Sequence, residues 1–501
     1  MRVFEFASRA EYWVALMPEI VLSLAAIAVL MGEVFSRERE AREWTMTATL
    51  LGLAIAGVAV ALLSGSRSVP DALIVADGLR TVADFVILGG TLLVVMYSGD
   101  YLDREGLARG EFFGLVLLAA VGMMLLVAAR DLILLFVALE LMSIAVYVLT
   151  GYARRRPRSS EASLKYFLVG AFASAFLLYG IALFYGLAGT TRLATAGPAI
   201  AAAVASRDLV LLAAVGLVLI GFGFKVAAVP FHMWTPDAYE GAPTPVTALM
   251  ATGVKAAAFV ALLRVLTVDL FAAREVWRDA VWWLAILTMI VPNLIALAQE
   301  DVKRMLAYSS VAHAGYLLVG VAAASALGRS ASLFYLAAYT VMTVGSFAIV
   351  FHVAGKGDRR SLIEDYRGLG WRRPALGVAL VVFLLSLAGF PPTAGFVGKL
   401  YLLQSAVEAG ETSLAVTLVL TSLVAYYYYL RVVWKMYFDA ADEAPDSQVV
   451  AATSPVFRVA TVVCVGLLLL AGLFPGRAVD TVRSAVGEAE ASPPAAGVDG
   501  S

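Results

Sequence analysis

The sequence predicts an all-α integral membrane protein with about fourteen transmembrane helices, which form two inverted five-helix repeats that each contain a broken helix. The first observation behind this prediction is composition: of 501 residues, 61% are hydrophobic and only 15% are charged, and the mean hydropathy is +0.86. A soluble chain carries about a quarter charged residues, so this surface must face lipid. The other two observations are the many long apolar segments and the Gly and Pro residues that interrupt two of them.

The apolar segments are long enough to cross a bilayer. A helix rises about 1.5 Å per residue, so about 20 apolar residues span a hydrocarbon core of about 30 Å. The expected spans lie near 12–31, 44–64, 78–101, 111–129, 131–152, 162–187, 208–229, 242–266, 279–299, 302–324, 331–354, 374–406, 411–437 and 455–474. We expect the first to be a retained span and not a signal peptide, because acidic residues accompany the basic ones before it and no small-residue cleavage site follows it.

Lysine and arginine in the loops indicate how the spans are oriented. Alternate loops are basic, and the strongest contain Arg37, Arg39, Arg42, Arg154, Arg155, Arg156, Arg158, Lys356, Arg359, Arg360, Arg367, Arg372 and Arg373. This side carries about 19 basic residues and the other about 12, so the positive-inside rule places it in the cytoplasm and both termini on the opposite side. The loop between the seventh and eighth spans has no Lys or Arg, so the bias is moderate.

Two of the expected spans are interrupted in a similar way. The seventh meets Pro230 and Pro236 after a stretch with two glycines, and the twelfth contains Gly389, Pro391, Pro392, Gly395 and Gly398. Proline removes an amide donor and clashes with the preceding turn, and in lipid the freed carbonyls need partners in protein or trapped water. Counting five spans from the fourth and five from the ninth, the broken helix is the fourth member of each set. A repeat with an odd number of spans inserts its second copy upside down, as in transport proteins whose broken helices mark the pathway.

These features divide the chain into five parts. We expect a three-helix membrane segment at 1–110, five-helix repeats at 111–270 and 271–440, a transmembrane helix at 441–475 and a flexible tail at 476–501. The end of the tail, from about Gly487, is acidic and rich in Pro, Ala and Gly, a composition that is typical of disorder.

Lysine is rare in this chain and is placed in an unusual way. Only seven of the 37 basic residues are lysine, yet Lys225, Lys255 and Lys399 lie within apolar segments. Arginine does not lose its proton in proteins, whereas a buried lysine does so readily. Lysine at mid-membrane in a chain that otherwise uses arginine indicates a cation that can be discharged, which is what a proton relay requires. The alternative is that these residues bridge helices or reach to the membrane surface.

Glu140 lies in the middle of the fifth span, where a charge costs about 2.5–3.5 kcal/mol on insertion scales. Lys225 is its candidate partner, in a pair that switches between bound and unbound states. Lys165 and His313 are candidates to extend the line, the histidine because it passes a proton between its two nitrogens. Lys165 is equally explained as a residue that reaches the surface, and His313 as a hydrogen-bonded core residue. His232 lies beside the break in the seventh span and either gates water or caps a helix end.

Other classes of function lack their sequence signals. A single cysteine, Cys464, and three separated histidines give no disulfide, no cysteine-bound iron–sulfur cluster and no metal-ligand spacing. There is no glycine-rich phosphate loop, and a net charge of -1 gives no basic field for nucleic acid. We therefore expect no cofactor or metal in this chain and no nucleic-acid partner. The tyrosines at 426–429 are expected to pack or to lie at the membrane surface, and not to bind a quinone.

Four long motifs carry a resemblance to a known family. They are LELMSIAVYVLTGY (139–152), FKVAAVPFHMWTPDAYEGAPTPVTALMATGVKAAAFVALLRV (224–265), NLIALAQEDVKRMLAYSSVAHAGYLL (293–318) and SLAGFPPTAGFVGKLYLL (386–403). Over nearly its whole length the chain closely resembles the subunit N family of bacterial NADH–quinone oxidoreductase, or respiratory complex I. Subunits L and M and the Mrp-type cation/proton antiporters share the PxHxWxPDA-like core, but the PFHMWTPDAYEGAP form and the lysine at 399 are similar to subunit N.

The resemblance implies a proton-relay role for the residues that match the family's motifs, namely Glu140, Lys225, Lys255 and Lys399, with support from Lys165 and His232. It also implies a multi-pass subunit of the bacterial inner membrane, joined to other membrane subunits of the complex in a hetero-oligomer. NADH oxidation, FMN, iron–sulfur clusters and quinone reduction would then belong to other subunits. Two alternatives remain: an Mrp-type antiporter subunit without redox coupling, and a purely structural subunit, against which the buried lysines argue.

Overall fold

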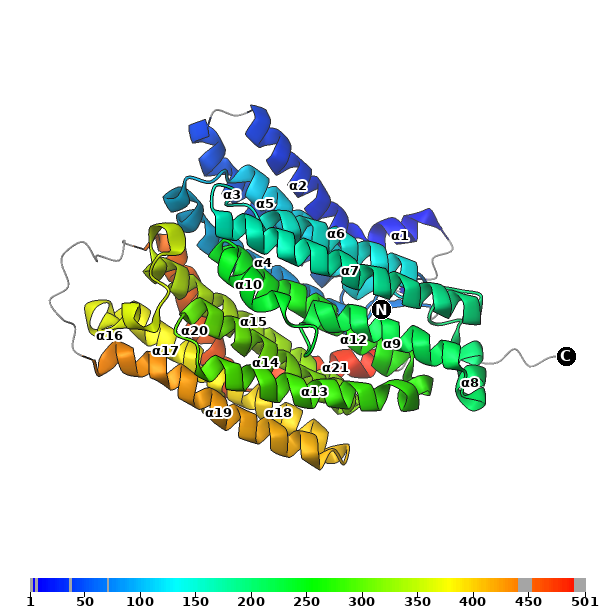
Figure 1. Cartoon of the computed structure of the whole chain (residues 1–501). Helices are drawn as coiled ribbons and strands as arrows, with labels where there is room; N and C mark the ends of the chain where they lie inside the picture. Colours follow the sequence, from blue (N-terminus) through cyan, green and yellow to red (C-terminus); the bar gives the residue numbers. More distant parts are fainter. Residues whose placement is uncertain (1–2, 5–7, 36–37, 70–71, 440–452, 491–501) are drawn as a thin grey trace.

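A computed structural model describes residues 3–4, 8–35, 38–69, 72–439 and 453–490. Nearly all of these residues are helical (Figure 1). The helices are α1 (Arg9–Ala15), α2 (Met17–Phe35), α3 (Glu38–Leu63), α4 (Gly78–Glu105), α5 (Gly110–Ala128), α6 (Leu132–Thr150), α7 (Pro157–Ala188), α8 (Gly197–Ser206), α9 (Leu209–Val226), α10 (Trp234–Gly241), α11 (Thr244–Leu249), η1 (Met250–Val254), α12 (Lys255–Arg264), η2 (Val265–Asp269), η3 (Phe271–Ala273), α13 (Arg274–Leu297), α14 (Val302–Ala322), α15 (Ala326–Ala354), η4 (Lys356–Asp358), η5 (Ile363–Tyr366), α16 (Leu369–Arg372), α17 (Pro374–Ala388), α18 (Ala394–Glu408), α19 (Thr412–Tyr437), α20 (Pro455–Leu473) and α21 (Gly476–Glu490). Two short strands, β1 (Val3–Phe4) and β2 (Arg67–Ser68), pair in parallel.

The expected transmembrane spans are confirmed. In the part of the chain that the structure describes, 13 helices are long and apolar enough to cross a membrane, and they correspond to all the expected spans except the twelfth. The twelfth is a discontinuous pair, α17 and α18, each of 15 residues. In the described residues, the bundle thus has 13 helices of spanning length, α9 of the seventh span among them, and one further span that is formed by α17 and α18 together.

The seventh span ends where the sequence predicts a break. α9 stops at Val226, and Ala227 takes a left-handed backbone conformation with φ of +60°. The N–H of Val229 donates to Thr288 Oγ1 at 2.9 Å, so a backbone donor that the break leaves free finds a partner in the protein. α10 then continues the chain toward the side assigned as cytoplasmic.

The twelfth span breaks between α17 and α18. Gly389 ends α17 with φ of +87°, a conformation that favours glycine. Lys399 Nζ donates to the Ala388 carbonyl at 2.9 Å, so a side chain from α18 satisfies a carbonyl that the break frees. Gly395 lets the two half-helices approach, because a Cβ there would overlap the Ser386 carbonyl oxygen. Both five-span sets therefore have a broken fourth member, as the repeat pattern predicts.

The eighth span lies at the centre of the bundle. It runs from α11 through η1, α12 and η2, and every residue of its most apolar stretch is buried. Both η1 and η2 are π-helical turns, which occur often at functional sites. The first of them ends directly before Lys255, and it packs against α4, α5 and α15. Lys255 is thus held inside the bundle and not at its surface.

Arginine also occupies the protein interior, which the loop pattern did not indicate. Arg80, Arg264 and Arg329 are buried near the end of the bundle assigned as non-cytoplasmic. Arg264 donates to the two carboxylate oxygens of Asp77 at 2.8 and 3.0 Å. A buried charge is tolerated when it is paired in this way, and this pair ties α12 to the start of α4.

Residues 476–490 differ from the expected flexible tail. They form helix α21, which lies against α4 and α15 and is drawn in red in Figure 1. Val482, Ala485 and Val486 are buried, so the helix presents one apolar face to the bundle. Arg483 Nε also donates to Tyr401 OH at 2.7 Å. Burial of this apolar face stabilises the helix despite the acidic composition of the segment. Residues 491–501 lie outside the described part of the chain.

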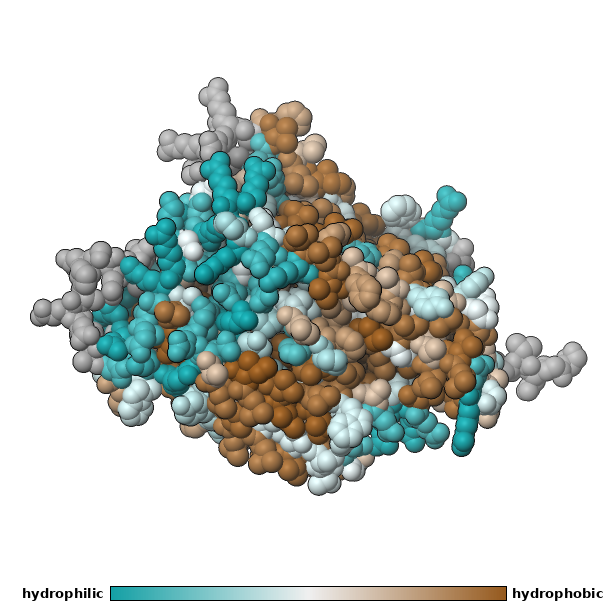
Figure 2. Space-filling view, viewed as in Figure 1, coloured by the Kyte–Doolittle hydropathy of each residue, from teal (hydrophilic) through white to brown (hydrophobic). Residues whose placement is uncertain are grey.

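The outer surface fits a lipid environment. On the face shown in Figure 2, an apolar band lies beside polar regions at the ends of the bundle. Large apolar side chains are exposed on many spans, for example Val137, Phe172, Leu423 and Val462. Such a continuous apolar surface is rare on soluble monomers, so the expectation of an integral membrane protein is confirmed.

Candidate functional site

Lys225 lies near the end of α9, directly before the break in the seventh span, and is buried. Its Nζ donates to Ser143 Oγ at 2.7 Å and to Tyr147 OH at 3.2 Å, both on α6. The same nitrogen lies 5.2 Å from the ring centroid of Tyr147 and 5.9 Å from that of Tyr166. Aromatic faces attract a cation at such distances, so this site suits an ammonium group, and no carboxylate of the described residues is in contact with it.

The expected ion pair between Glu140 and Lys225 is not formed. Glu140 instead accepts a hydrogen bond from Ser174 Oγ of α7 at 2.5 Å. The cause is its position on α6, where it is half-buried on a stripe whose other members, Val137 and Ile144, are exposed. The carboxylate therefore lies toward the outer surface of the bundle, about one turn from the serine that binds Lys225.

Lys255 is bound by the neighbouring helix α14. Its Nζ donates to the carbonyl oxygen and to Oγ of Ser310, both at 2.5 Å. Tyr339 OH on α15 donates to the same Ser310 hydroxyl at 2.9 Å. The Lys255 amine also lies 5.8 Å from the centroid of the Tyr339 ring. All three side chains are buried, so the amine is held by polar groups and an aromatic face away from bulk water.

His313 lies one turn further along α14 and is buried. Its Nδ1 lies 2.6 Å from Tyr335 OH, and its Nε2 lies 3.1 Å from Tyr429 OH. Its ring is 5.0 Å from the Tyr339 ring and 5.3 Å from the Tyr316 ring, measured between centroids. His313 therefore sits between the tyrosine that reaches Lys255 through Ser310 and the tyrosine that approaches Lys399.

Lys399 is buried at the first turns of α18. Besides its bond to Ala388, its Nζ lies 4.7 Å from the centroid of the Tyr316 ring. Tyr316 OH accepts from Asn293 Nδ2 at 3.2 Å, and Asn293 Oδ1 accepts from Tyr428 OH at 2.9 Å. The amine is thus placed between the helix break and a hydrogen-bonded aromatic cluster.

The structure brings Lys255, His313 and Lys399 together along one helix. α14 supplies Ser310, His313 and Tyr316, spaced three residues apart, and side chains at this spacing lie on neighbouring positions of one face. The hydroxyl-bearing members of the line were missed by the sequence analysis: Ser310, Tyr316, Tyr335, Tyr339 and Tyr429. Their only sequence signal is polar side chains on helices that are apolar on every side.

The tyrosines at 426–429 have two different environments. Tyr427 is exposed, as expected for a residue at the surface of the bundle. Tyr428 and Tyr429 are fully buried, and Tyr429 OH contacts both His313 and Ser309. The expectation that the run packs is correct for these two, and they also supply hydroxyl groups to the buried line.

Lys165 lies in a cavity, here called the cytoplasmic cavity, at the end of the bundle that the loop charges assign to the cytoplasm, apart from the buried amines. Its side chain is 49% exposed and pairs with Glu161 at 2.8 Å and with Asp237 at 2.9 Å. The volume of this cytoplasmic cavity is about 200 Å³, and its lining comes from α7, α10 and α14: Arg158, Glu161, Ala162, Lys165, Asp237, Glu240, Gly241 and Arg304. Lys165 is thus a surface residue, the alternative left open by the sequence.

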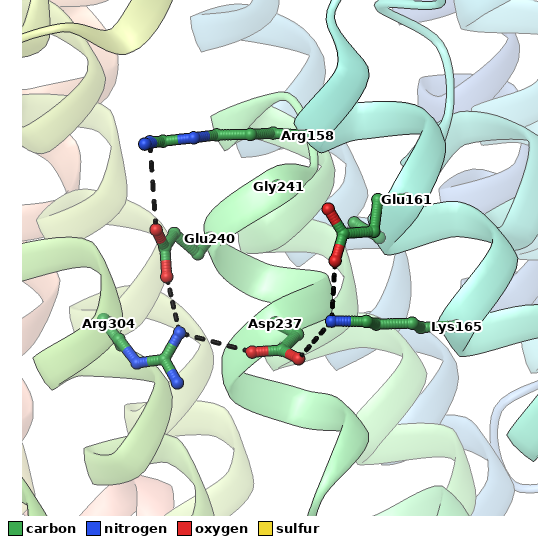
Figure 3. A pocket seen from close by; sticks show the side chains of 8 residues that line it. Arg158, Glu161, Lys165, Asp237, Glu240, Gly241 and Arg304 are labelled. Carbon is green, nitrogen blue, oxygen red and sulfur yellow. Dashed lines mark hydrogen bonds and ion pairs between the residues drawn. The ribbon is translucent and has the colours of Figure 1, made fainter.

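The charged residues of the cytoplasmic cavity form an alternating chain of ion pairs (Figure 3). Arg304 contacts Glu240 at 2.6 Å and Asp237 at 3.3 Å, and Asp237 contacts Lys165. Asp237 lies on α10, which is beyond the end of the seventh span. Burial raises the pKa of Asp237, but the hydrogen bond from Lys165 and the charge of Arg304 outweigh it and hold this pKa below its ordinary value. The cavity is therefore polar and charged but close to neutral in sum.

Two contacts that a relay through the expected residues would use are absent among the described residues. His232 is half-buried in the loop between α9 and α10, and its Nδ1 has no hydrogen-bond partner among the described residues. Within the same residues no hydrogen bond joins Lys225 to Lys255, although α9 and α12 pack against each other. The structure thus shows a line from Lys255 to Lys399 in which ring contacts join His313 to Tyr339 and Tyr316, and a separate amine site at Lys225.

Known proteins resemble this chain in sequence and in fold. The chain matches the family described as "NADH:quinone oxidoreductase/Mrp antiporter, TM" over residues 129–425. It is 46% identical over 475 residues to "NADH-quinone oxidoreductase subunit N" of Trichlorobacter lovleyi, covering 94% of this chain and 96% of the relative.

The fold is similar to that of a chain of respiratory complex I from Thermus thermophilus with bound aureothin. The two chains are 38% identical with a TM-score of 0.79, and the match covers 93% of this chain and 100% of the other. A chain of the Mrp complex from Dietzia sp. matches at 25% identity with a TM-score of 0.82, covering 97% and 98%. Identity is thus higher to the subunit N relative than to the Mrp chain.

Proposed function

The chain belongs to the family of NADH-quinone oxidoreductase subunit N, and we propose from its geometry that it carries protons by way of Lys225, Lys255, His313 and Lys399. As a member of that family it is a proton-translocating membrane subunit of respiratory complex I in the bacterial inner membrane. The Mrp-type alternative is not supported, because identity is 46% to subunit N of Trichlorobacter lovleyi and 25% to the Mrp chain.

One observation carries the proposed route. α14 places Ser310, His313 and Tyr316 in succession between two buried lysines, one on α12 and one on α18. Buried ionisable groups in a membrane are expensive and are placed where protons or ions pass. A line of such groups within contact distance of hydroxyls gives a proton successive sites through an otherwise apolar interior.

Each residue of the line has a role that follows from its contacts. Lys255 accepts a proton as an amine and stays bound to Ser310 through the carbonyl and the hydroxyl. His313 contacts one tyrosine hydroxyl through each nitrogen, so a proton taken up at one nitrogen allows release from the other. Lys399 receives the charge next to the break in the twelfth span, from which α18 leads toward the non-cytoplasmic side.

We place the link between this chain and the energy of electron transfer at Glu140. A carboxylate on the lipid-facing side of a span costs about 2.5–3.5 kcal/mol on insertion scales, so this half-buried group favours a neighbouring membrane subunit over lipid. A charge that moves in that neighbour would act on Glu140 and, through α6, on Ser143 and Lys225. NADH, FMN, the iron–sulfur clusters and quinone are assigned to other subunits of the complex.

Replacement of Lys255 by methionine tests the route. Lys255→Met keeps most of the length and the unbranched stem of the side chain but removes the amine that holds the proton. In membrane vesicles that contain the whole complex, we expect NADH-driven proton pumping to fall at least about tenfold, while NADH oxidation by an artificial electron acceptor continues. Fluorescence quenching of a pH-sensitive dye measures the pumping.

Lys435→Met is the matched control. Lys435 pairs with Glu364 and Asp439, each at 2.7 Å, at the cytoplasmic end of α19 and away from the buried line. Its loss is expected to leave pumping unchanged. Normal pumping by an assembled Lys255→Met complex would contradict the proposed route.

A further inference from the structure

The helices that enclose the cytoplasmic cavity also close its inner end. On α7, Tyr166 lies one turn deeper than Ala162, which lines the cavity; on α10, Trp234 lies one turn deeper than Asp237. The two rings are stacked, with centroids 4.2 Å apart and planes at 7°. Both are buried. The stack therefore lies between the charged cavity and the interior of the bundle.

Lys225 lies on the inner side of this stack. Its Nζ is 5.9 Å from the centroid of the Tyr166 ring and 5.4 Å from that of Phe224. Trp234 Nε1 donates to the Phe224 carbonyl at 3.1 Å, which fixes the indole beside the lysine. Tyr147, which binds the lysine, packs edge-on against Tyr166 with centroids 4.7 Å apart. Aromatic rings thus separate the amine from the cavity.

The close approach of the two helices is built into the chain. Gly241 at the end of α10 faces Ala162 and the Arg158 carbonyl of α7, and a Cβ at this glycine would overlap both. The absence of a side chain lets α10 lie directly on α7, which brings Trp234 into register with Tyr166. The stack is therefore a consequence of helix packing and not of a mobile loop.

We propose that the Tyr166–Trp234 stack is a selectivity gate at the cytoplasmic entrance, which keeps water and hydrated metal cations from Lys225 and admits protons alone. This inference rests on the proposed function, because it requires Lys225 to be on the proton route. A cavity of about 200 Å³ lined by charged groups holds several waters. Apolar constrictions stop water and ions by dewetting, and the ring faces offer none of the oxygen ligands with which a cation replaces its water.

The charge of Lys225 supplies a means of control. A protonated amine attracts the ring faces around it and holds the stack closed. When Lys225 passes its proton inward, this attraction is lost and the rings separate enough for one water. A hydronium ion in the cavity water then gives up the proton of one O–H bond and becomes water, and this proton forms the N–H bond on Nζ. The restored charge draws the rings together. Each opening of the ring stack thus admits one proton. While the amine is charged, the stack is closed, so the amine is not accessible from the cavity and from the interior of the bundle at the same time.

Trp234→Leu tests the gate. The variant keeps an apolar side chain but removes the plane that stacks on Tyr166. The whole complex is reconstituted into liposomes without NADH, and passive proton flux under an imposed pH gradient is measured with a trapped pH dye. We expect this flux to rise at least about tenfold over the unmodified complex, and uptake of radioactive sodium to rise with it.

Trp277→Leu is the matched control. Trp277 on α13 is also buried and also donates Nε1 to a backbone carbonyl, that of Leu270, at 3.0 Å. It does not line the cytoplasmic cavity. Its replacement removes the same volume and the same type of hydrogen bond, so it is expected to lower stability without raising the proton flux.

Three outcomes overturn the gate. The first is a Trp234→Leu complex that is as tight as the unmodified one, and the second is a Trp277→Leu complex that leaks to the same extent. The third is a leak that persists in the double variant Trp234→Leu/Lys225→Met, because such a leak bypasses the lysine. If Trp234→Leu does not assemble on native gels, Tyr166→Leu removes the stack from the α7 side with the same expected leak. Failure of the proposed route is seen separately, as normal pumping by Lys255→Met.

Discussion

Lys255 donates two hydrogen bonds to a single residue of the neighbouring helix, Ser310, one to its carbonyl oxygen and one to its hydroxyl. A carbonyl oxygen accepts from an ammonium group and from a neutral amine alike, and a hydroxyl both donates and accepts. The contact therefore persists in both charge states of the lysine. This is a useful property for a relay, because the proton leaves while the side chain stays in position.

Ser310→Ala is expected to slow proton transfer at Lys255 without dissociating the lysine from α14. The carbonyl contact remains, but the hydroxyl that also reaches Tyr339 is lost. A missing partner for a buried charge costs about 1–3 kcal/mol, which corresponds to a fall of about 5- to 160-fold in NADH-driven pumping. Ser332→Ala is the control, since this buried hydroxyl donates only within its own helix, to the Gly328 carbonyl at 2.8 Å. Equal pumping by the two variants would contradict a role for Ser310.

His313→Phe is expected to interrupt proton transfer between Lys255 and Lys399. The phenyl ring fills the same space but offers no nitrogen to Tyr335 or Tyr429. We expect pumping to fall at least about tenfold in assembled complexes, as for the loss of a positioned proton donor and acceptor. His352→Phe replaces a second buried histidine, whose ring lies 5.0 Å from that of Phe457, away from the line, and is expected to pump normally. Dye quenching in vesicles with matched amounts of complex gives the comparison.

Asp77→Ala is expected to lower stability and not pumping. The substitution leaves Arg264 buried without its carboxylate, a change that costs about 3–5 kcal/mol. Thermal unfolding of the purified complex, followed by loss of this subunit on native gels, measures the effect. Asp208→Ala removes an exposed helix cap at the start of α9 and is expected to cost only about 1 kcal/mol. Pumping per assembled complex that fell tenfold in Asp77→Ala would instead place this pair on the proton route.

Gly395→Ala is expected to distort the break in the twelfth span. The added Cβ meets the Ser386 carbonyl oxygen, which belongs to backbone and cannot rotate away. Overpacking of this kind costs about 1–3 kcal/mol or more, and it moves α18 and with it Lys399. We expect weaker assembly and reduced pumping together. Gly466→Ala on α20 is the control, because a Cβ there meets no atom within 4 Å.

Hydropathy and proline placement were sufficient to predict most of the fold. The spans, the two breaks and the depth of Lys225, Lys255 and Lys399 follow from local composition, because lipid permits few alternatives to a helix. For His313, the sequence left two alternatives open: a place in the proton relay, and a hydrogen-bonded position in the core. The angles at which α12, α14 and α18 cross decide between these two alternatives, and a single sequence does not specify those angles.

Contacts between helices account for what was not predicted. Glu140 and Lys225 lie on the fifth and seventh spans, and Lys225 does reach the fifth, but the rotation of α6 turns the carboxylate outward and leaves Ser143 to bind the amine. Of the tyrosines around His313, only Tyr429 belongs to the run that was expected to pack, and the sequence does not single out the others, because only their hydroxyl partners distinguish a packing residue from a member of the line. Helix α21 was expected to be flexible from composition, whereas its apolar face finds a site on α4 and α15. Each difference arises from a surface that exists only after the helices have assembled.

The outward position of Glu140 has a consequence for the biogenesis of the subunit. On the role proposed for Glu140, a newly inserted copy carries a half-buried carboxylate at its lipid-facing side until another membrane protein covers it, and this keeps the lone chain less stable than the incorporated one. A neighbour that covers Glu140 removes this cost, so incorporation into the complex is favoured over the lone chain. The group placed at the coupling end of the proton route would also report that the chain has found its partner.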